Sequence, residues 1–251
     1  MPAIRDTTGQ PHADPLETNN RDSTVNRILT SIAPWASWNP TTGCTKISDA
    51  CVNCYADATA HFLQSRNVPA YSNGFLPVFH PTRLSIPDTY RSPRRIFVDS
   101  MSDLFHEAFS DEQIYEIFTV MQNNRRHTYF VLTKRPERMH NILGSLPPMP
   151  HACIGVTVES DEYAWRAEYL SDLRDRFVTF VNCEPLLGPI GSLPTSGIDI
   201  CFAAKEAGPH RRPSAPEWFT SLEHYCVSNN IRYIGHRFDI RTDAGKRPIL
   251  P

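Results

Sequence analysis

The sequence has no long hydrophobic run. Its apolar strings, such as Ile96-Phe97-Val98, are far shorter than the roughly 20 residues that a helix needs to cross a bilayer. A charged-then-apolar leader is missing from its start, and internal repeats and low-complexity blocks are missing throughout. We therefore expect a cytoplasmic protein that has no membrane partner.

The sequence also lacks a strong excess of one charge. Its 25 Lys and Arg residues and 27 Asp and Glu residues give a formal net charge of −2. That balance excludes a globally basic nucleic-acid-binding surface, although it leaves room for a local basic groove. With 40% hydrophobic and 21% charged residues, the composition is globular and excludes wholesale disorder.

Cysteine is present in an odd number, with seven residues in a chain of 251. An odd number in a long chain without a leader argues against a disulfide scaffold. We therefore expect reduced thiols, some of which bind a metal.

Two regions of the chain differ in pattern. Residues 1–26 are polar, contain Pro and show no periodicity, so we expect a flexible N-terminal arm. Residues 27–251 are expected to form a single (β/α) domain, with a variable segment on the substrate side near the C-terminus.

Apolar runs rich in strand formers alternate with helical patterns along this domain. Ser110 and Gln113 predict a helix start with a capping box, and Pro136 predicts the first residue of another helix. A further helix is expected to start at Ser214, because Glu217 follows three residues later. The strands are expected near residues 34–38 and at residues 94–100, 128–133, 152–158, 176–181, 198–203 and 231–234.

The predicted strands are continuous apolar runs rather than alternating ones. Such runs are typical of a parallel sheet that is buried on both faces. Repeated βαβ units predict the α/β class, with a sheet that closes into a full or a partial barrel. In either arrangement, chemistry is expected at the C-terminal ends of the strands, so the polar residues just past those ends are the candidates.

Three cysteines, Cys44, Cys51 and Cys54, lie close together with the spacing C-x6-C-x2-C. One interpretation is a zinc site, which normally takes four ligands and would need His61 or His80 as the fourth. A second is a group of structural cysteines that act as small buried hydrophobic residues. The third is a [4Fe-4S] cluster held by three thiolates, with its fourth iron open to a small molecule. Three cysteines at the first strand–helix junction of a (β/α) barrel are what a radical S-adenosylmethionine (SAM) enzyme requires.

Six blocks of the sequence resemble a known family. In order, they are WNPTTGC, ISDACVNCYA, RRIFVDSMSDLFHE, LTKRPERM, IGVTVE and NCEPLLGPI. They resemble the phage Gp37/Gp68-like family, also described as the DUF5131 domain, strongly over residues 38–190 and weakly beyond them. That family resembles a divergent branch of the radical SAM superfamily, which implies a partial (β/α)6 TIM-like barrel.

The resemblance implies a metal site and its cofactors. Cys44, Cys51 and Cys54 would hold the [4Fe-4S] cluster, and S-adenosyl-L-methionine would chelate the open iron. A flavodoxin- or ferredoxin-like protein would donate the electron. The first gap is longer than the usual C-x3-C, and Asn53 stands where an aromatic residue usually precedes the third cysteine. Tyr55 is expected to contact the adenine in its place.

Further cofactor contacts are expected at the strand ends. Ser100, Ser102 and Asp103 are expected to bind the methionine amino group and the ribose of SAM, although a simple loop or helix cap would use the same residues. Lys134 is expected to bind the SAM carboxylate or a phosphate, and Glu159 the ribose hydroxyls. The alternatives are a solvated surface cation for Lys134 and a helix-capping carboxylate for Glu159.

The substrate side departs from the family pattern. Lys205 and Glu206 replace glycines, so they are candidate catalytic or substrate-contacting residues unless they form a stabilising ion pair. The thiol of Cys183 is expected to quench a substrate radical by donating a hydrogen atom, unless it is packed in the core. Five basic residues are expected to contact a DNA or nucleotide substrate: Arg135, His210, Arg211, Arg212 and His236.

The resemblance implies a radical SAM enzyme that generates a 5′-deoxyadenosyl radical for hydrogen abstraction. Its expected target is a nucleobase side chain in phage DNA, which it modifies or rearranges, as in a hypermodified thymine; this expectation rests on family analogy. Two alternatives stay open. One is a radical SAM enzyme that acts on a free small molecule or a peptide, and the other is a zinc-stabilised binding module with no enzymatic activity.

Overall fold

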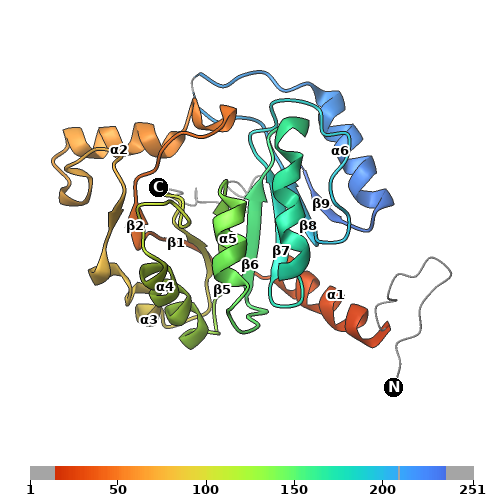
Figure 1. Ribbon diagram of the computed structural model, residues 1–251, viewed down its shortest axis with the longest axis horizontal. Helices are drawn as coiled ribbons and strands as arrows, with labels where there is room; N and C mark the ends of the chain where they lie inside the picture. The colour runs from red at the N-terminus through yellow and green to blue at the C-terminus, as the bar shows by residue number, and fades with distance from the viewer. Residues whose placement is uncertain (1–14, 209, 236–251) are drawn as a thin grey trace. The chain divides into compact units, whose positions relative to one another are not determined.

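The computed structural model describes residues 15–208 and 210–235 of the chain (Figure 1). The chain divides into two compact units, one ending at Ile32 and the other beginning at Ala33. In the first unit, Pro15–Leu29 form helix α1. A helix therefore occupies part of the segment for which a flexible arm was predicted, and residues 1–14 lie outside the described part of the chain.

The second unit is built on a seven-stranded sheet. The strands are arranged in the order β1-β4-β5-β6-β7-β8-β9, and every neighbouring pair is parallel. The predicted α/β class and parallel sheet are therefore confirmed. The strands are β1 (Trp35–Trp38), β4 (Arg95–Val98), β5 (Thr128–Thr133), β6 (Ala152–Thr157), β7 (Val178–Cys183), β8 (Ile200–Ala203) and β9 (Arg232–Ile234).

The sheet is open. A closed barrel would need hydrogen bonds between the edge strands β1 and β9, and the described strands form no such pair. The sheet has the seven strands that the apolar runs predict, one more than the (β/α)6 arrangement that the resemblance implies, because β9 pairs with β8. The strand order follows the chain without reversal, so the carboxyl ends of all seven strands lie along one edge of the sheet.

Helices follow β4, β5, β6 and β8 and cover one face of the sheet (Figure 1), whereas the β7–β8 connection, residues 184–199, contains no helix. At the start of α4, Ser110 Oγ accepts a hydrogen bond from Gln113 N at 3.3 Å, and Gln113 Oε1 accepts one from Ser110 N at 3.0 Å, which confirms the capping box. Pro136 begins α5, as predicted. The covering helices are α4 (Asp111–Asn123), α5 (Pro136–Leu143), the 3₁₀ helix η4 (Asp161–Leu173) and α6 (Pro216–Ser228).

The predicted start of the last helix is wrong by two residues. Helix α6 begins at Pro216 with Ala215 as its N-cap. The hydroxyl of Ser214 does not cap the helix, because it donates a hydrogen bond to the carbonyl oxygen of Leu186 at 2.6 Å. A tertiary contact has replaced the local one that the sequence pattern favours.

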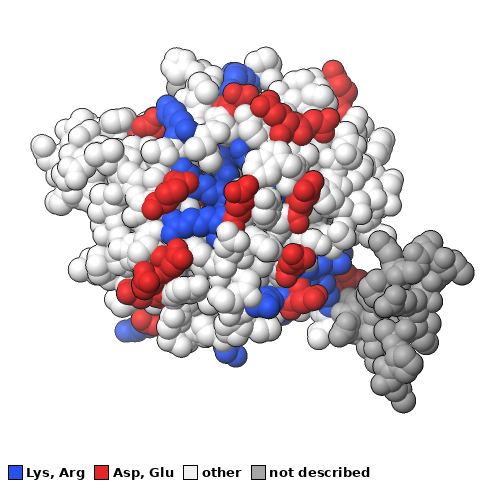
Figure 2. All heavy atoms as spheres, viewed as in Figure 1, with Lys and Arg blue, Asp and Glu red and all other residues white. Residues whose placement is uncertain are grey.

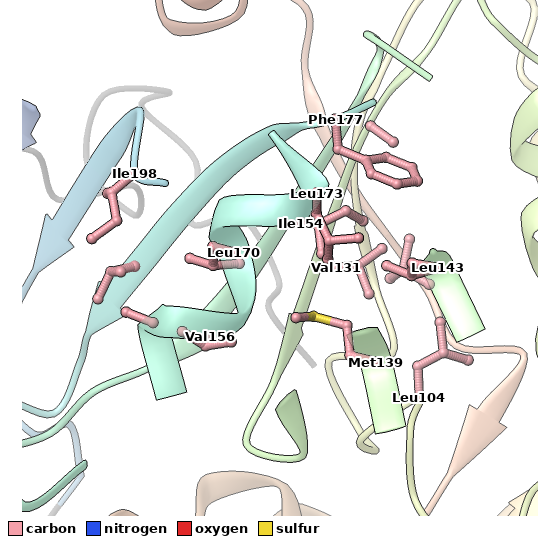
Figure 3. Close-up of a cluster of buried hydrophobic side chains, with 14 of the residues drawn as sticks. Leu104, Val131, Met139, Leu143, Ile154, Val156, Leu170, Leu173, Phe177 and Ile198 are labelled. Carbon is pink, nitrogen blue, oxygen red and sulfur yellow. The ribbon is translucent and has the colours of Figure 1, made fainter. Parts of the chain in front are cut away.

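The hydrophobic core lies between the sheet and these helices (Figure 3). Val131 on β5 and Ile154 and Val156 on β6 point towards Met139 of α5 and Leu170 of η4, and all five side chains are buried. Complete burial of one such side chain contributes about 1.5–3 kcal/mol to stability. This layer fixes the positions of the strands whose ends carry the site.

The opposite face of the sheet carries a row of aromatic rings. The ring centroids of Trp35 and Phe130 are 5.0 Å apart, those of Phe130 and Phe180 are 6.1 Å apart, and those of Phe180 and Phe202 are 5.6 Å apart. Gly155 makes room for this row, because a Cβ atom there would lie 2.5 Å from the Phe180 ring. We call these four rings the aromatic row.

A long insertion between β1 and β4 carries Cys44, Cys51 and Cys54. It contains a two-stranded antiparallel sheet, a helix that follows the last of the three cysteines, and several single turns. The elements are β2 (Thr41–Thr42), the 3₁₀ turn η1 (Asp49–Cys51), α2 (Tyr55–Ser65), the 3₁₀ turn η2 (Pro69–Tyr71), β3 (Val78–Phe79), the 3₁₀ turn η3 (Pro81–Arg83) and α3 (Ile86–Thr89).

Charges are mixed on the surface seen in Figure 2. Lys and Arg side chains form a short central band, with Asp and Glu side chains on both sides of it. This face therefore carries no extended region of one sign. Within the described residues, no helix has the length and apolar character needed to traverse a bilayer.

Candidate functional site

The cysteine loop, residues 44–54, lies over the carboxyl edge of the sheet at the rim of a pocket. Cys44, Cys51 and Cys54 are free thiols, partly exposed, and all three line the pocket. The other four cysteines are fully buried. The structure therefore separates the cysteines into a group of three at the pocket and a group of four inside the protein.

Gly43 determines how the chain enters the cysteine loop. Its φ of +86° is in the left-handed region, and a Cβ atom there would lie 2.1 Å from the carbonyl oxygen of Leu76. Its amide donates a hydrogen bond to Met101 O at 2.8 Å, and the amide of Cys44 donates one to Phe75 O at 3.1 Å. Only glycine fits this position, which explains the residue before the first cysteine.

Arg135 anchors the beginning of the cysteine loop. Its Nη1 donates hydrogen bonds to Cys44 Sγ at 3.5 Å and Asp103 Oδ2 at 3.1 Å, and its Nη2 donates to Thr45 Oγ1 at 2.9 Å. Its Nε contacts Glu107 Oε1 at 3.0 Å. Arg135 is only 7% exposed. The structure thus places Arg135, which was predicted to bind substrate, in contact with the first cysteine of the loop.

Glu206 anchors the end of the loop from the opposite side. Its Oε2 accepts hydrogen bonds from Asn53 Nδ2 at 3.2 Å and from Arg212 N at 2.6 Å, and its Oε1 forms an ion pair with the Arg212 guanidinium. Arg212 also donates to Asp49 O at 2.9 Å. The hydrogen bonds of Arg212 hold the pKa of Glu206 at about 2 despite its burial. The β8–α6 connection is therefore locked to the cysteine loop.

The cysteines differ in their electrostatic surroundings. Burial raises the pKa of the Cys44 thiol to about 11, with Asp103 adding to the rise and Arg135 opposing it. Burial also tends to raise the pKa of Cys51, but the ammonium group of Lys134 and hydrogen bonds to the thiolate outweigh it, and the pKa is lowered. Cys51 is therefore the more easily ionised of the two thiols.

The pocket beside the cysteine loop has a cavity volume of about 290 Å³. Its floor is the aromatic row together with Phe97 and Leu132, and polar groups from successive strand ends form its rim. A cavity with apolar walls and a few converging polar groups is typical of a small-molecule site. The pocket lies at the strand ends, where the βαβ pattern predicted chemistry.

Five residues predicted to bind the cofactor line this pocket: Tyr55, Ser100, Ser102, Asp103 and Lys134. The hydroxyl of Tyr55 donates to Ser100 O at 2.6 Å, and Ser102 Oγ donates to Gly43 O at 2.7 Å. Ser100 Oγ donates to the side-chain oxygen of Asn39 at 3.0 Å. Hydrogen bonds within the protein therefore hold these three side chains.

Asp103 is fully engaged by protein donors. Its Oδ1 accepts from Thr133 Oγ1 at 2.7 Å and from Phe105 N at 3.1 Å, and its Oδ2 accepts from Lys134 N at 3.0 Å and from Arg135. The carboxylate therefore fixes the end of β5 against the β4–α4 connection. It supports the pocket wall, and few of its lone pairs remain for a cofactor.

Lys134 and Glu159, both predicted to bind the cofactor, have different surroundings. Lys134 lines the pocket, and its ammonium group forms no ion pair or hydrogen bond with a described residue. Glu159 is completely buried and forms an ion pair with Arg166 at 2.9 Å, away from the pocket lining. Lys134 is therefore the cation available to a ligand, whereas Glu159 braces the connection after β6.

Cys183 does not reach the pocket. It is completely buried in the helix-side core, with its sulfur 4.0 Å from that of Cys201. Successive side chains of a strand point to opposite faces, so Asn182 and Glu184 line the pocket and Cys183 points away from it. We therefore correct the prediction that Cys183 donates a hydrogen atom to a substrate radical.

The remaining predicted substrate residues are scattered. Lys205 is exposed and outside the pocket lining, whereas Glu206 lies in it. His210 and Arg211 are exposed, and the carbonyl oxygen of His210 accepts a hydrogen bond from Asn53 at 3.0 Å. His236 lies outside the described residues.

Several polar residues of the pocket were not among the predicted ligands, and three of them stand at strand ends: Asp99, Thr157 and Asn182. Asp99 directly follows β4 with φ 55°, is 4% exposed, and its Oδ2 has no hydrogen-bond partner within the described chain. Burial raises the pKa of this carboxyl to about 8. Each of the three stands at or just after a strand end, and that position was the only signal in the sequence.

The donor set at the pocket suits an iron–sulfur cluster. In the described part of the chain, no group of three or more His, Cys, Asp or Glu side chains is arranged to hold one metal ion. A cubane requires something else, because its three ligands bind three different irons and are separated by the width of the cluster. Three free thiols line one pocket beside Lys134 and Arg135, and thiolates are the donor type that such a cluster takes.

A family model described as a protein of unknown function, DUF5131, matches residues 31–239. The chain belongs to the DUF5131 family. No curated protein and no solved structure matches it. The match includes the cysteine loop, the pocket and all seven strands of the sheet, so the site is part of the DUF5131 domain itself.

Proposed function

We propose that this DUF5131 chain is a radical SAM enzyme. Its proposed reaction modifies or rearranges the side chain of a nucleobase, such as that of a hypermodified thymine, in phage DNA. The observation that carries the proposal is that Cys44, Cys51 and Cys54 line one pocket at the carboxyl edge of a parallel sheet. We also propose that the open parallel sheet is a partial barrel of the radical SAM type. A flavodoxin- or ferredoxin-like protein is the proposed electron donor.

The cluster and SAM, when bound, would supply one-electron cleavage of the sulfonium and a 5′-deoxyadenosyl radical for hydrogen abstraction. The chain's own residues hold and shield these groups. Cys44, Cys51 and Cys54 are the proposed cluster ligands, and the anchors at Arg135 and Glu206 keep the loop that carries them in place. Positioning of this kind reduces the reorganisation needed at the reactive step.

Lys134 is the proposed partner of the SAM carboxylate. Its ammonium group lines the pocket and is free of ion pairs with the described residues. Tyr55, Ser100 and Ser102 form the adjoining wall. Tyr55 would contact the adenine, and the two serines would contact the methionine amino group and the ribose. The aromatic row below them excludes water from the floor, which protects a reactive radical from side reactions.

The test is metal analysis of the anaerobically purified protein. We expect about four iron and four sulfide per chain, as the formula of the cluster requires, and a change in its electron paramagnetic resonance spectrum on addition of SAM. Cys51→Ala should lose the iron, whereas the matched control Cys226→Ala, which removes a buried helix thiol, should keep it. Zinc near one per chain without iron would instead favour the binding-module alternative.

The nucleic-acid part of the proposal needs a separate measurement. The reduced protein is incubated with SAM, dithionite and either phage or host DNA. Release of 5′-deoxyadenosine is then followed by chromatography. The DNA is digested to nucleosides, and their masses are measured by mass spectrometry. Release of 5′-deoxyadenosine without any new nucleoside would support SAM cleavage and contradict DNA as the substrate.

A further inference from the structure

Three pocket residues form a row across neighbouring strands. Thr157 on β6 is in register with Asn182 on β7, and Asn182 is in register with Phe202 on β8. All three line the pocket. A hydroxyl, a primary amide and an aromatic ring are therefore presented side by side by three rigid strands.

The polar half of this row lacks partners within the described chain. Thr157 is 0% exposed and its Oγ1 has no hydrogen-bond partner, and the side-chain amide of Asn182 likewise makes no hydrogen bond to a described residue. A buried polar group that is left unpaired costs stability. Such groups at a pocket wall point to a ligand that supplies the missing hydrogen bonds.

The apolar half of the row is suited to a flat ring. Phe202 is half-buried and stands at 85° to Phe180, which in turn stands at 66° to Phe130. The rings of Phe180 and Phe130 thus hold Phe202 in place, while part of the Phe202 ring faces the pocket. Aromatic side chains of this kind stack on nucleobases, because every base has a π-face.

We propose that Thr157, Asn182 and Phe202 bind the substrate's nucleobase, with its face on Phe202 and its edge hydrogen-bonded to Asn182 and Thr157. The amide group of Asn offers a donor and an acceptor together, which matches the edge of a base. The base must be unpaired, since a cavity of about 290 Å³ holds no duplex. This inference rests on the proposed function and names the part of the same pocket that recognises the substrate.

Direct binding to the full-length protein, without any turnover, tests this assignment. Thymidine 5′-monophosphate and 5′-deoxyadenosine are the two probes, and isothermal titration calorimetry measures their affinities. Asn182→Ala should weaken thymidine 5′-monophosphate binding by about fivefold or more, the value of one good bidentate contact. The matched control Asn141→Ala, at an exposed position of α5, should leave it unchanged.

A second pair of variants tests the stacking contact. Phe202→Leu should also weaken thymidine 5′-monophosphate binding by about fivefold or more, and Phe62→Leu, at an exposed position of α2, should not. Circular dichroism shows whether each variant is folded. Because Asn182→Ala and Phe202→Leu are separate variants, the test remains valid if one of them fails to fold.

Two results would overturn the inference. The first is a wild-type protein that binds no thymidine 5′-monophosphate. The second is a set of variants in which only 5′-deoxyadenosine binding falls, because the row would then serve the adenine of the cofactor. Neither result depends on iron content or SAM cleavage, so failure here is distinguishable from failure of the proposed function.

Discussion

The guanidinium group of Arg135 donates a hydrogen bond to Cys44 Sγ at 3.5 Å and, from the same nitrogen, one to Asp103 Oδ2 at 3.1 Å. One buried cation thus connects the first cysteine of the loop with the connection after β4. Because Arg135 and Asp103 are 7% and 6% exposed, removal of the Arg135 charge leaves the Asp103 carboxylate buried without its cationic partner.

We therefore expect Arg135→Gln to lower the free energy of unfolding by about 3 kcal/mol or more, the range for breaking a buried pair. Arg135→Lys keeps the charge but not the planar fork, so its loss should be smaller. Urea denaturation measures both, and Arg125→Gln at an exposed position is the control. Equal stability of the Arg135→Gln and Arg125→Gln variants would contradict the anchoring role.

The contact between Glu206 and Arg212 gives a second prediction. Glu206→Gln should loosen the far end of the cysteine loop, because it weakens the bonds to Arg212 and Asn53. The reaction of the loop thiols with a thiol reagent should become about tenfold faster, as expected for the loss of one charged hydrogen bond. Glu217→Gln, at an exposed position of α6, should react at the wild-type rate.

The same ion pair predicts a loss of stability in acid. The pKa of Glu206 is about 2 in the folded protein, below the usual value of about 4.3 for an unfolded chain. Its stabilising contribution is therefore complete above pH of about 4.3 and is lost as the pH falls towards 2. Between these two pH values, the free energy of unfolding should fall less steeply with decreasing pH in the Glu206→Gln variant than in the wild type.

The carboxyl group of Asp99 predicts the opposite pH dependence, a loss of stability as the pH rises. Burial raises the pKa of its carboxyl to about 8, with Asp103 adding to the rise, while bonds from Thr41 and the charge of Arg83 oppose it. The unfolded value is about 3.9, so the folded state holds an extra proton between these limits and loses stability as the pH rises through them. The expected slope is up to about 1.4 kcal/mol per pH unit.

Asp99→Asn should remove this dependence. The side-chain oxygen of Asn can still accept the hydrogen bond from Thr41 N, and Asn tolerates the positive φ at this position. The variant should therefore be more stable than the wild type at pH 7, and the difference should shrink towards pH 5. Chemical denaturation at the two pH values measures it, and a constant difference would contradict a raised pKa.

Local patterns predicted the strands of the seven-stranded sheet but not the faces that their side chains occupy. The capping box at Ser110 and the start of α5 at Pro136 were correct because each depends on residues that are neighbours in sequence. Cys183 was assigned to the wrong face of β7, because a strand that is buried on both faces shows no alternation between polar and apolar residues. Asn182, its neighbour, is the residue that lines the pocket.

Long-range partners were equally beyond the sequence pattern. Arg135 lies 91 residues from Cys44, and Glu206 lies 153 residues from Asn53, and both were predicted to meet substrate. A charged residue at a strand end has the same local signature whether it binds a ligand or an ion-pair partner. Only the packing of the cysteine loop on the strand ends distinguishes the two roles.

The close approach of Gly155 to Phe180 gives the last prediction. A methyl group at residue 155 would lie 2.5 Å from the Phe180 ring, and neither strand can move, because β6 and β7 are central in the sheet. Gly155→Ala should therefore lower the free energy of unfolding by about 1–3 kcal/mol, the usual cost of overpacking. Since Phe180 also supports Phe202, the substitution should weaken thymidine 5′-monophosphate binding as well.

The double variant Gly155→Ala, Phe180→Leu tests the cause of that loss. Removal of the ring makes room for the added methyl group, so the double variant should be more stable than the sum of the two single effects predicts. Binding of thymidine 5′-monophosphate should not recover, because Phe202 has lost its supporting ring. Strictly additive stabilities would show that the ring is not what excludes a side chain at residue 155.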